Sequence, residues 1–149
     1  PQWRGVLRIV GRAGRQSALV QRMRRELPRP QQVELIDALP QPKLVRNLRS
    51  CLALLSASTE EGFDYPVLEA KAEGIPTIIS DIPVHREFHE GSSLLFPVAD
   101  DGSALANHVI SCLRDQGLWE QLSRSGFELA QRLSVEAQVS RIDDQLRHL

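Results

Sequence analysis

The sequence predicts an α/β fold: a Rossmann-like, doubly wound parallel sheet followed by amphipathic helices. Three observations carry this prediction. Short apolar runs alternate with segments of helical periodicity from residue 5 to about residue 96. Gly and Pro separate these segments at short intervals. Beyond residue 102 only helical periodicity remains. Alternating strands and helices in a chain of this length are typical of parallel strands joined by crossover helices.

The first half of the chain predicts three strands and two helices. The run 5–10 is rich in β-forming residues and ends at Gly11. Leu19, Met23 and Leu27 recur on one helical face, which Ser17 can cap and Pro28 ends. The other predicted elements of this half are a strand at 32–37, a short helix at 43–50 and, at 52–58, an apolar strand expected at the centre of the sheet and buried on both faces.

The second half continues the alternation and then becomes helical. The predicted elements are a helix at 66–73, a strand at 76–80, a helical turn near 85–90 and a strand at 93–96. Three apolar stripes follow, which begin at Leu105, Leu118 and Val135. We expect these helices to cover the sheet or to reach toward another domain.

Composition and charge narrow the class of protein. The chain has 149 residues, 42% hydrophobic residues, 25% charged residues and a net charge of −1, which is typical of one globular domain over residues 1–149. No apolar run has the length of a membrane span. Residues 1–49 hold eleven Lys and Arg against three Asp and Glu, a net charge of +8. Because no aromatic residues are interleaved with these arginines, the charge favours an anionic small molecule or a membrane surface over nucleic acid.

The segment 61–69 carries the densest chemical signal. Pro66 suits the first turn of a helix, where its missing N–H has no intrahelical partner. The amides of Gly62, Phe63 and Asp64 then lie free at a helix N-terminus, which attracts anions and phosphates. A ligand can approach the backbone of Gly62 closely because glycine has no side chain.

Two carboxylates bracket this turn. Glu61 lies at the end of the preceding strand, where it can face a reacting carbon. Glu69 lies at the end of the first turn of the helix, where it can accept hydrogen bonds from sugar hydroxyls. Phosphate-binding amides between two carboxylates are the groups that a nucleotide-sugar requires. The segment therefore predicts a ligand site at the carboxyl edge of a parallel sheet.

The wider string resembles a known family. It comprises Glu61-Gly-Phe, Pro66-Val-Leu-Glu69-Ala, Gly74-x-Pro76 and Ser80-Asp81, with Leu94-Leu-Phe-Pro97 downstream. From about residue 7 to residue 148 the chain resembles the C-terminal nucleotide-sugar-binding domain of retaining GT-B glycosyltransferases (family 4, glycosyl transferases group 1), the family of sucrose synthases and bacterial mannosyltransferases. The resemblance implies transfer of a hexose from a UDP- or GDP-linked donor to an acceptor hydroxyl, without a metal or other cofactor.

The resemblance also assigns roles to single residues. Glu61 matches the glutamate that lies near the donor sugar and is the expected catalytic residue. Glu69 matches the glutamate that binds the ribose. Gly62, Phe63 and Asp64 are the further donor-binding candidates, and Tyr65 and His85 are candidates for the wall of the pocket.

Three departures from the family pattern matter. Asp64-Tyr65 stands where the family commonly has Gly-Leu or Gly-Ile, and Ile82-Pro-Val-His85 replaces a glycine-rich turn. The family's first strand and its loop with an arginine and a lysine are not found in these residues, nor is the N-terminal acceptor domain. We therefore expect a fragment that alone binds donor weakly and transfers nothing. The carbohydrate or lipid-linked acceptor would bind the missing domain, in a cytoplasmic protein with peripheral contact at the inner membrane face.

Alternative functions remain open. A GT-B epimerase or phosphorylase, or a non-catalytic regulatory domain, would share the fold. Gly11-Arg-Ala-Gly14 with Asp37 resembles half of a dinucleotide-binding fingerprint and keeps an NAD-binding module open. His85 and His89 are four residues apart, but with no further ligand near in sequence they do not predict a metal site.

Overall fold

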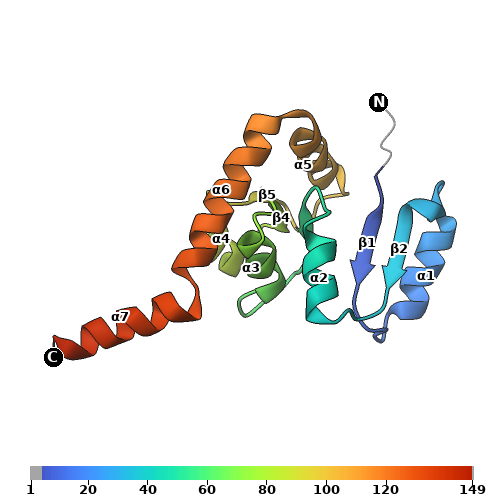
Figure 1. Cartoon of the computed structure of the whole chain (residues 1–149). Coiled ribbons are helices and arrows are strands. Elements are labelled where there is room, and N and C mark those ends of the chain that lie inside the picture. The colour runs from blue at the N-terminus through green and yellow to red at the C-terminus, as the bar shows by residue number, and fades with distance from the viewer. Residues whose placement is uncertain (1–4, 149) are drawn as a thin grey trace. The chain divides into compact units, whose positions relative to one another are not determined.

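The computed structural model describes residues 5–148 (Figure 1). The chain divides into two compact units, one that ends at Leu44 and one that begins at Val45. Helix α2, Gln41–Leu48, contains this boundary. The prediction of an α/β fold with parallel strands is confirmed, and the strands pair as two parallel sheets, β1-β2 and β3-β4-β5. That residues 1–149 act as one domain stays a prediction.

The first unit is a strand–helix–strand element. Strand β1, Leu7–Val10, pairs in parallel with β2, Val33–Ile36, and α1, Ser17–Glu26, and a 3-10 turn, Pro30–Gln32, connect them. Ser17 was predicted as the N-cap but is the first helical residue; its hydroxyl donates to the Gly14 carbonyl instead, at 2.5 Å. The carboxyl ends of both strands lie at one edge because the pairing is parallel.

The second unit holds a three-stranded parallel sheet in the order β3-β4-β5. Its strands are β3, Leu54–Ser56, β4, Thr77–Ser80, and β5, Leu94–Phe96. The prediction that the strand at 52–58 is the central buried one was wrong for this sheet: β3 is half-buried, whereas every residue of β4 is buried. The two β-branched isoleucines and the flanking hydroxyl residues of β4 fit this position between two strands.

Helices cover this sheet and build its core. They are α3, Tyr65–Ala72, α4, Pro83–His89, α5, Ser103–Arg114, and α6, Gln116–Arg132. Figure 1 shows α6 running beside α3, and the two helices are in extensive contact. The buried cluster of this core consists of Ile78 and Phe96 from the sheet, Cys112 from α5 and Leu122 from α6. The Trp119 indole donates to the Leu52 carbonyl at 2.8 Å and ties α6 to the segment before β3.

The last helix differs from the two before it. Helix α7, Val135–Arg147, extends from the end of α6 in Figure 1 and has no buried residue. Its predicted apolar stripe is present but exposed, with Val135 at 74% and Leu146 at 64%. Of the three predicted helices, α5 and α6 therefore contribute buried residues to the core and α7 does not.

Candidate functional site

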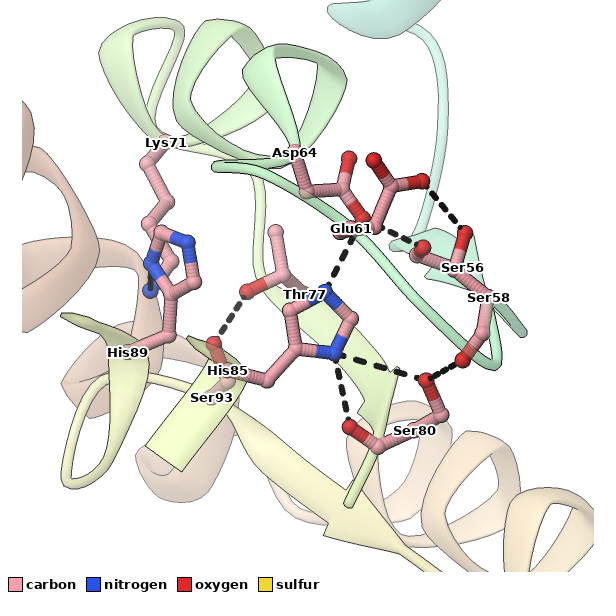
Figure 2. A network of polar contacts seen from close by, with 10 residues as sticks. All are labelled: Ser56, Ser58, Glu61, Asp64, Lys71, Thr77, Ser80, His85, His89 and Ser93. Carbon is pink, nitrogen blue, oxygen red and sulfur yellow. Dashed lines mark hydrogen bonds and ion pairs between the residues drawn. The ribbon is translucent and has the colours of Figure 1, made fainter. Parts of the chain in front are cut away.

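The turn between β3 and α3 holds the predicted site. Glu61 and Gly62 of this turn are both exposed, and the turn ends at Asp64, the residue before α3. The Ser58 hydroxyl donates to Glu61 Oε1 at 2.6 Å (Figure 2). Within residues 5–148, the amides of Gly62, Phe63 and Asp64 donate to no backbone carbonyl. The turn thus presents an oriented carboxylate and free amides at a helix N-terminus, a combination suited to an anionic sugar derivative.

A cleft of about 520 Å³ opens beside this turn. Glu61 and Gly62 line it together with Glu87 and Phe88 of α4. The remaining lining residues are Thr59, Glu60, Ile82, Pro83 and Val84. In the sequence, Glu87 falls where the resembled family often has Pro-Glu, and no role was assigned to it. The other predicted donor residues, Phe63, Asp64 and Glu69, do not line this cleft.

The aromatic residues of the turn pack rather than line the cleft. The Phe63 ring meets the edge of Phe88 with centroids 5.0 Å apart and lies 5.3 Å from the Tyr65 ring. Tyr65 itself is 70% exposed on the surface of α3. Edge-to-face contacts between aromatic rings are favourable, so the contact of Phe63 with Phe88 stabilises the packing of the turn against α4.

Asp64 and His85 are buried behind the turn. Asp64 Oδ2 accepts from the Ser56 hydroxyl at 2.6 Å and lies 3.1 Å from His85 Nε2. Asp64 is 6% exposed and His85 has no exposed surface. His85 therefore stands behind the cleft and not on its wall, and the Asp64 carboxylate has protein partners. A direct donor contact by Asp64 stays a prediction.

His85 also contacts Ser80, which gives a buried Asp–His–Ser arrangement. His85 Nδ1 lies 3.4 Å from the Ser80 hydroxyl, and that hydroxyl donates to the Ser58 carbonyl. Nucleophilic catalysis requires an accessible hydroxyl whose proton passes to the histidine. Ser80 is 1% exposed and uses its proton on a backbone carbonyl, so this arrangement is not a hydrolase triad.

A second buried polar cluster lies next to the first, with the ring centroids of His85 and His89 6.0 Å apart. Lys71 of α3 is 1% exposed; its amine donates to Ser92 at 2.6 Å and lies 3.2 Å from His89 Nδ1. Burial lowers the pKa of Lys71 to about 7. Burial first, and then the Lys71 charge, lower the pKa of His89 to about 4. His89 Nε2 makes no hydrogen bond within the described residues. The nearby Phe63 backbone raises the pKa of His89 and so offsets part of its lowering. The burial of Lys71 was not predictable from the sequence, because a lysine in a predicted helix is normally expected at the surface.

The remaining predicted residue, Glu69, lies exposed on α3, outside the 520 Å³ cleft. Its predicted contact with the ribose stays a prediction. Among residues 5–148, no three His, Cys, Asp or Glu side chains are grouped so that they could hold a metal ion. No helix in the same described range is both long and apolar enough to span a bilayer.

The first unit contains a separate cleft of about 720 Å³ at the carboxyl ends of β1 and β2. Gly11, Arg12, Gly14, Ser17 and Asp37 all line it. The structure thus brings the two glycines of the half fingerprint and its acidic residue to one cavity, as the alternative of a dinucleotide-binding module requires.

Comparisons with known proteins decide the family. The family model described as glycosyl transferases group 1 matches residues 2–115. The chain belongs to this family. No curated protein matches the sequence. The Glu61–Glu69 string that carries the resemblance lies inside the matched range, and the predicted membership is confirmed.

Solved structures of glycosyltransferases share the fold. Sucrose-phosphate synthase from Thermosynechococcus elongatus aligns with a TM-score of 0.81 at 25% identity, over 97% of this chain and 39% of that one. Anabaena Alr3699/HepE, in complex with UDP and glucose, aligns with a TM-score of 0.78 at 21% identity, over 97% of this chain and 41% of that one. The lipopolysaccharide outer core galactosyltransferase WaaB aligns at 0.75 and 23% identity, over 96% and 40%. This group 1 chain therefore has the Rossmann-like fold of a GT-B C-terminal domain and spans about two fifths of these structures.

Proposed function

We propose that the chain is the donor-binding domain of a retaining glycosyltransferase that moves a hexose from a UDP- or GDP-linked donor to a carbohydrate or lipid-linked acceptor hydroxyl. The observation that carries this proposal is the opening of Glu61 and Gly62 onto one cleft beside free amides at the N-terminus of α3. Membership of the group 1 family and the structure of HepE in complex with UDP and glucose support it.

In this proposal each part of the turn has a task. The amides of Gly62 and Phe63 bind the donor phosphate or sugar, since a helix N-terminus stabilises negative charge. The Glu61 carboxylate, oriented by Ser58, supports the positive charge that develops at the anomeric carbon. Glu69 binds the ribose. Transfer then needs no bound metal, because amides and positive groups stabilise the leaving diphosphate.

The test is turnover of the full-length protein with UDP- and GDP-linked hexoses. Removal of an electrostatic group that acts in the transition state lowers kcat by about a hundredfold or more. We expect Glu61→Gln to do so, while donor affinity measured by calorimetry changes only a few-fold. Glu90→Gln is the matched control, since Glu90 is exposed at the end of α4 and does not line the cleft. Unchanged kcat in Glu61→Gln contradicts the proposed role.

Two further expectations follow for the domain and its surroundings. Residues 1–149 alone should bind donor weakly and transfer nothing, and tight binding in calorimetry contradicts this. The net positive charge of residues 1–49 supports a peripheral contact with an anionic membrane surface at the cytoplasmic face. Co-sedimentation with vesicles that contain anionic lipid, compared with neutral vesicles, tests the contact.

A second candidate function is dinucleotide binding in the first unit. The observation that favours it is the cleft that Gly11, Gly14 and Asp37 share. NADH fluorescence enhancement that Asp37→Ala abolishes supports this candidate. UDP binding without any NADH binding contradicts it.

A further inference from the structure

Asp64 occupies a backbone conformation that ordinary side chains avoid. Among residues 5–148 it is the one non-glycine residue with positive φ, at 58°. Asp adopts this left-handed region more readily than most residues, yet the conformation remains unfavourable and persists where the surroundings fix it. It sets the direction in which the chain leaves Glu61 and Gly62 and enters α3. Whatever holds Asp64 therefore sets the geometry of the turn.

Two side chains from other elements hold the carboxylate. Ser56 of β3 donates to Oδ2 at 2.6 Å, and His85 of α4 lies 3.1 Å from the same oxygen (Figure 2). Asp64 is 6% exposed, so water cannot replace these partners freely. A buried carboxylate that loses a partner carries a large penalty and tends to move to solvent. Here such a movement would take the turn with it.

The position of His85 is itself set by a hydrogen bond to the backbone of β4. Its Nδ1 lies 2.7 Å from the Ser80 carbonyl, which only accepts hydrogen bonds, so Nδ1 carries a proton. Its Nε2 faces the carboxylate, so a second proton lies between Nε2 and Oδ2. The imidazole thus bridges the buried strand β4 and the turn with a hydrogen bond on each side.

A second chain of hydrogen bonds connects strand β4 to Glu61. The Ser80 hydroxyl donates to the Ser58 carbonyl, and the Ser58 hydroxyl donates to Glu61 Oε1. Figure 2 shows this chain of contacts running from His85 past Ser80 to Glu61. The Phe63 ring adds a third link to α4 through Phe88.

We propose that His85 is a positioning residue of the donor site: through Asp64 it fixes the amides of Gly62 and Phe63 and the carboxylate of Glu61. This inference rests on the proposed function of the turn as the donor site. His85 acts without touching the donor, because it is fully buried and absent from the residues that line the cleft.

The test combines four variants of the full-length protein: His85→Ala, His85→Gln, Asp64→Gly and the double variant Asp64→Gly/His85→Ala. Loss of one hydrogen bond to a charged group corresponds to a change of roughly ten- to a hundredfold. We expect His85→Ala to lower kcat/KM for the donor by about that factor, with contributions from both KM and kcat. His85→Gln keeps an N–H donor near the Nε2 position and should recover most of the loss.

The double variant separates positioning from general damage. Glycine adopts positive φ without side-chain support and leaves no buried carboxylate without a partner. Asp64→Gly/His85→Ala should therefore exceed His85→Ala in kcat/KM. The stability control is Thr77→Val, which removes the Thr77–Ser93 hydrogen bond of 2.7 Å at the other end of β4. It should lower Tm without lowering kcat/KM.

Hydrogen exchange of the amides at 62–65 supplies a readout that needs no donor. Exchange should accelerate on the order of tenfold in His85→Ala and stay near wild type in Thr77→Val. The inference is overturned if His85→Ala, shown to be folded, leaves exchange and kcat/KM within twofold of wild type, or if neither His85→Gln nor the double variant recovers activity. If the wild type transfers no hexose, the proposed function fails, and exchange alone still decides whether His85 positions the turn.

Discussion

Replacing Lys71 with Met should change how the stability of the second unit depends on pH. The Lys71 amine is buried between α3 and α4, with His89 and Ser92 as its partners. Burial lowers its pKa from 10.5 to about 7. Met keeps an unbranched stem of similar volume and removes the ionisable group.

The sign follows from proton counts. Below pH 7 the amine is charged in both states, and the folded state carries the full penalty of burying it. Between pH 7 and 10.5 the unfolded chain binds the proton and the folded chain does not, so the free energy of unfolding rises with pH. Each unit of pKa difference corresponds to about 1.4 kcal/mol. From pH 7 to 9.5, wild type should therefore gain about 3 kcal/mol relative to Lys71→Met.

Urea unfolding at several pH values between 7 and 10 measures this difference. Trp119 lies in the second unit and serves as the fluorescent probe once Trp3 is replaced with Phe in both proteins. Groups that do not contact Lys71 contribute equally to both proteins and cancel. Loss of the Lys71 charge changes the pKa of His89, but burial still holds that pKa below its ordinary value, so His89 does not titrate appreciably above pH 7 in either protein. Parallel curves for wild type and Lys71→Met, within about 1 kcal/mol, refute the burial of an amine with a lowered pKa.

Four other outcomes test the fold and the site. Gly126→Val should destabilise the second unit by about 1–3 kcal/mol in urea unfolding, because a Cβ at this position would lie 3.0 Å from Lys71 Cγ. A variant as stable as wild type would show that α3 and α6 are packed less closely than the structure has them. Trp119→Phe loses the hydrogen bond to Leu52 and should lower the unfolding free energy by about 1 kcal/mol, measured by circular dichroism. Glu69→Gln should raise KM for the donor more than it lowers kcat, and a pure loss of kcat contradicts a ribose contact. Transfer activity in EDTA should stay within about twofold, since amides and positive groups are proposed to carry the charge.

Periodicity predicted most elements because it depends on neighbours in sequence. The helix at 66–73 is found at Tyr65–Ala72, and the strand at 76–80 is found at Thr77–Ser80. The centre of the three-stranded sheet was not predictable in this way: the segments 52–58 and 76–80 are both short and apolar, and only strand order distinguishes them. The Glu61–Gly62 turn was predictable because Pro66 marks the start of the helix that follows it.

The buried polar clusters escaped prediction for a different physical reason. Lys71 is a good helix former whose position is normally assigned to solvent. Its partners, His89 and Ser92, lie 18 and 21 residues away, beyond any local pattern. Only the packing of α3 against α6, where Gly126 leaves room for the lysine stem, makes the burial apparent.

The two unusual segments of the sequence prove to be in contact. Asp64 stands where the family commonly has glycine, and His85 belongs to the segment that replaces a glycine-rich turn. At φ 58°, glycine needs no side-chain support, whereas Asp64 uses hydrogen bonds from Ser56 and His85. Each change alone would strand a buried polar group, but together they satisfy one another. We therefore expect Asp at position 64 to require a hydrogen-bond donor at position 85. A library randomised at position 85 tests this by selection for transfer activity: Asp64 should retain His or Gln, Asp64→Gly should accept apolar residues as well, and equal tolerance in both backgrounds contradicts the coupling.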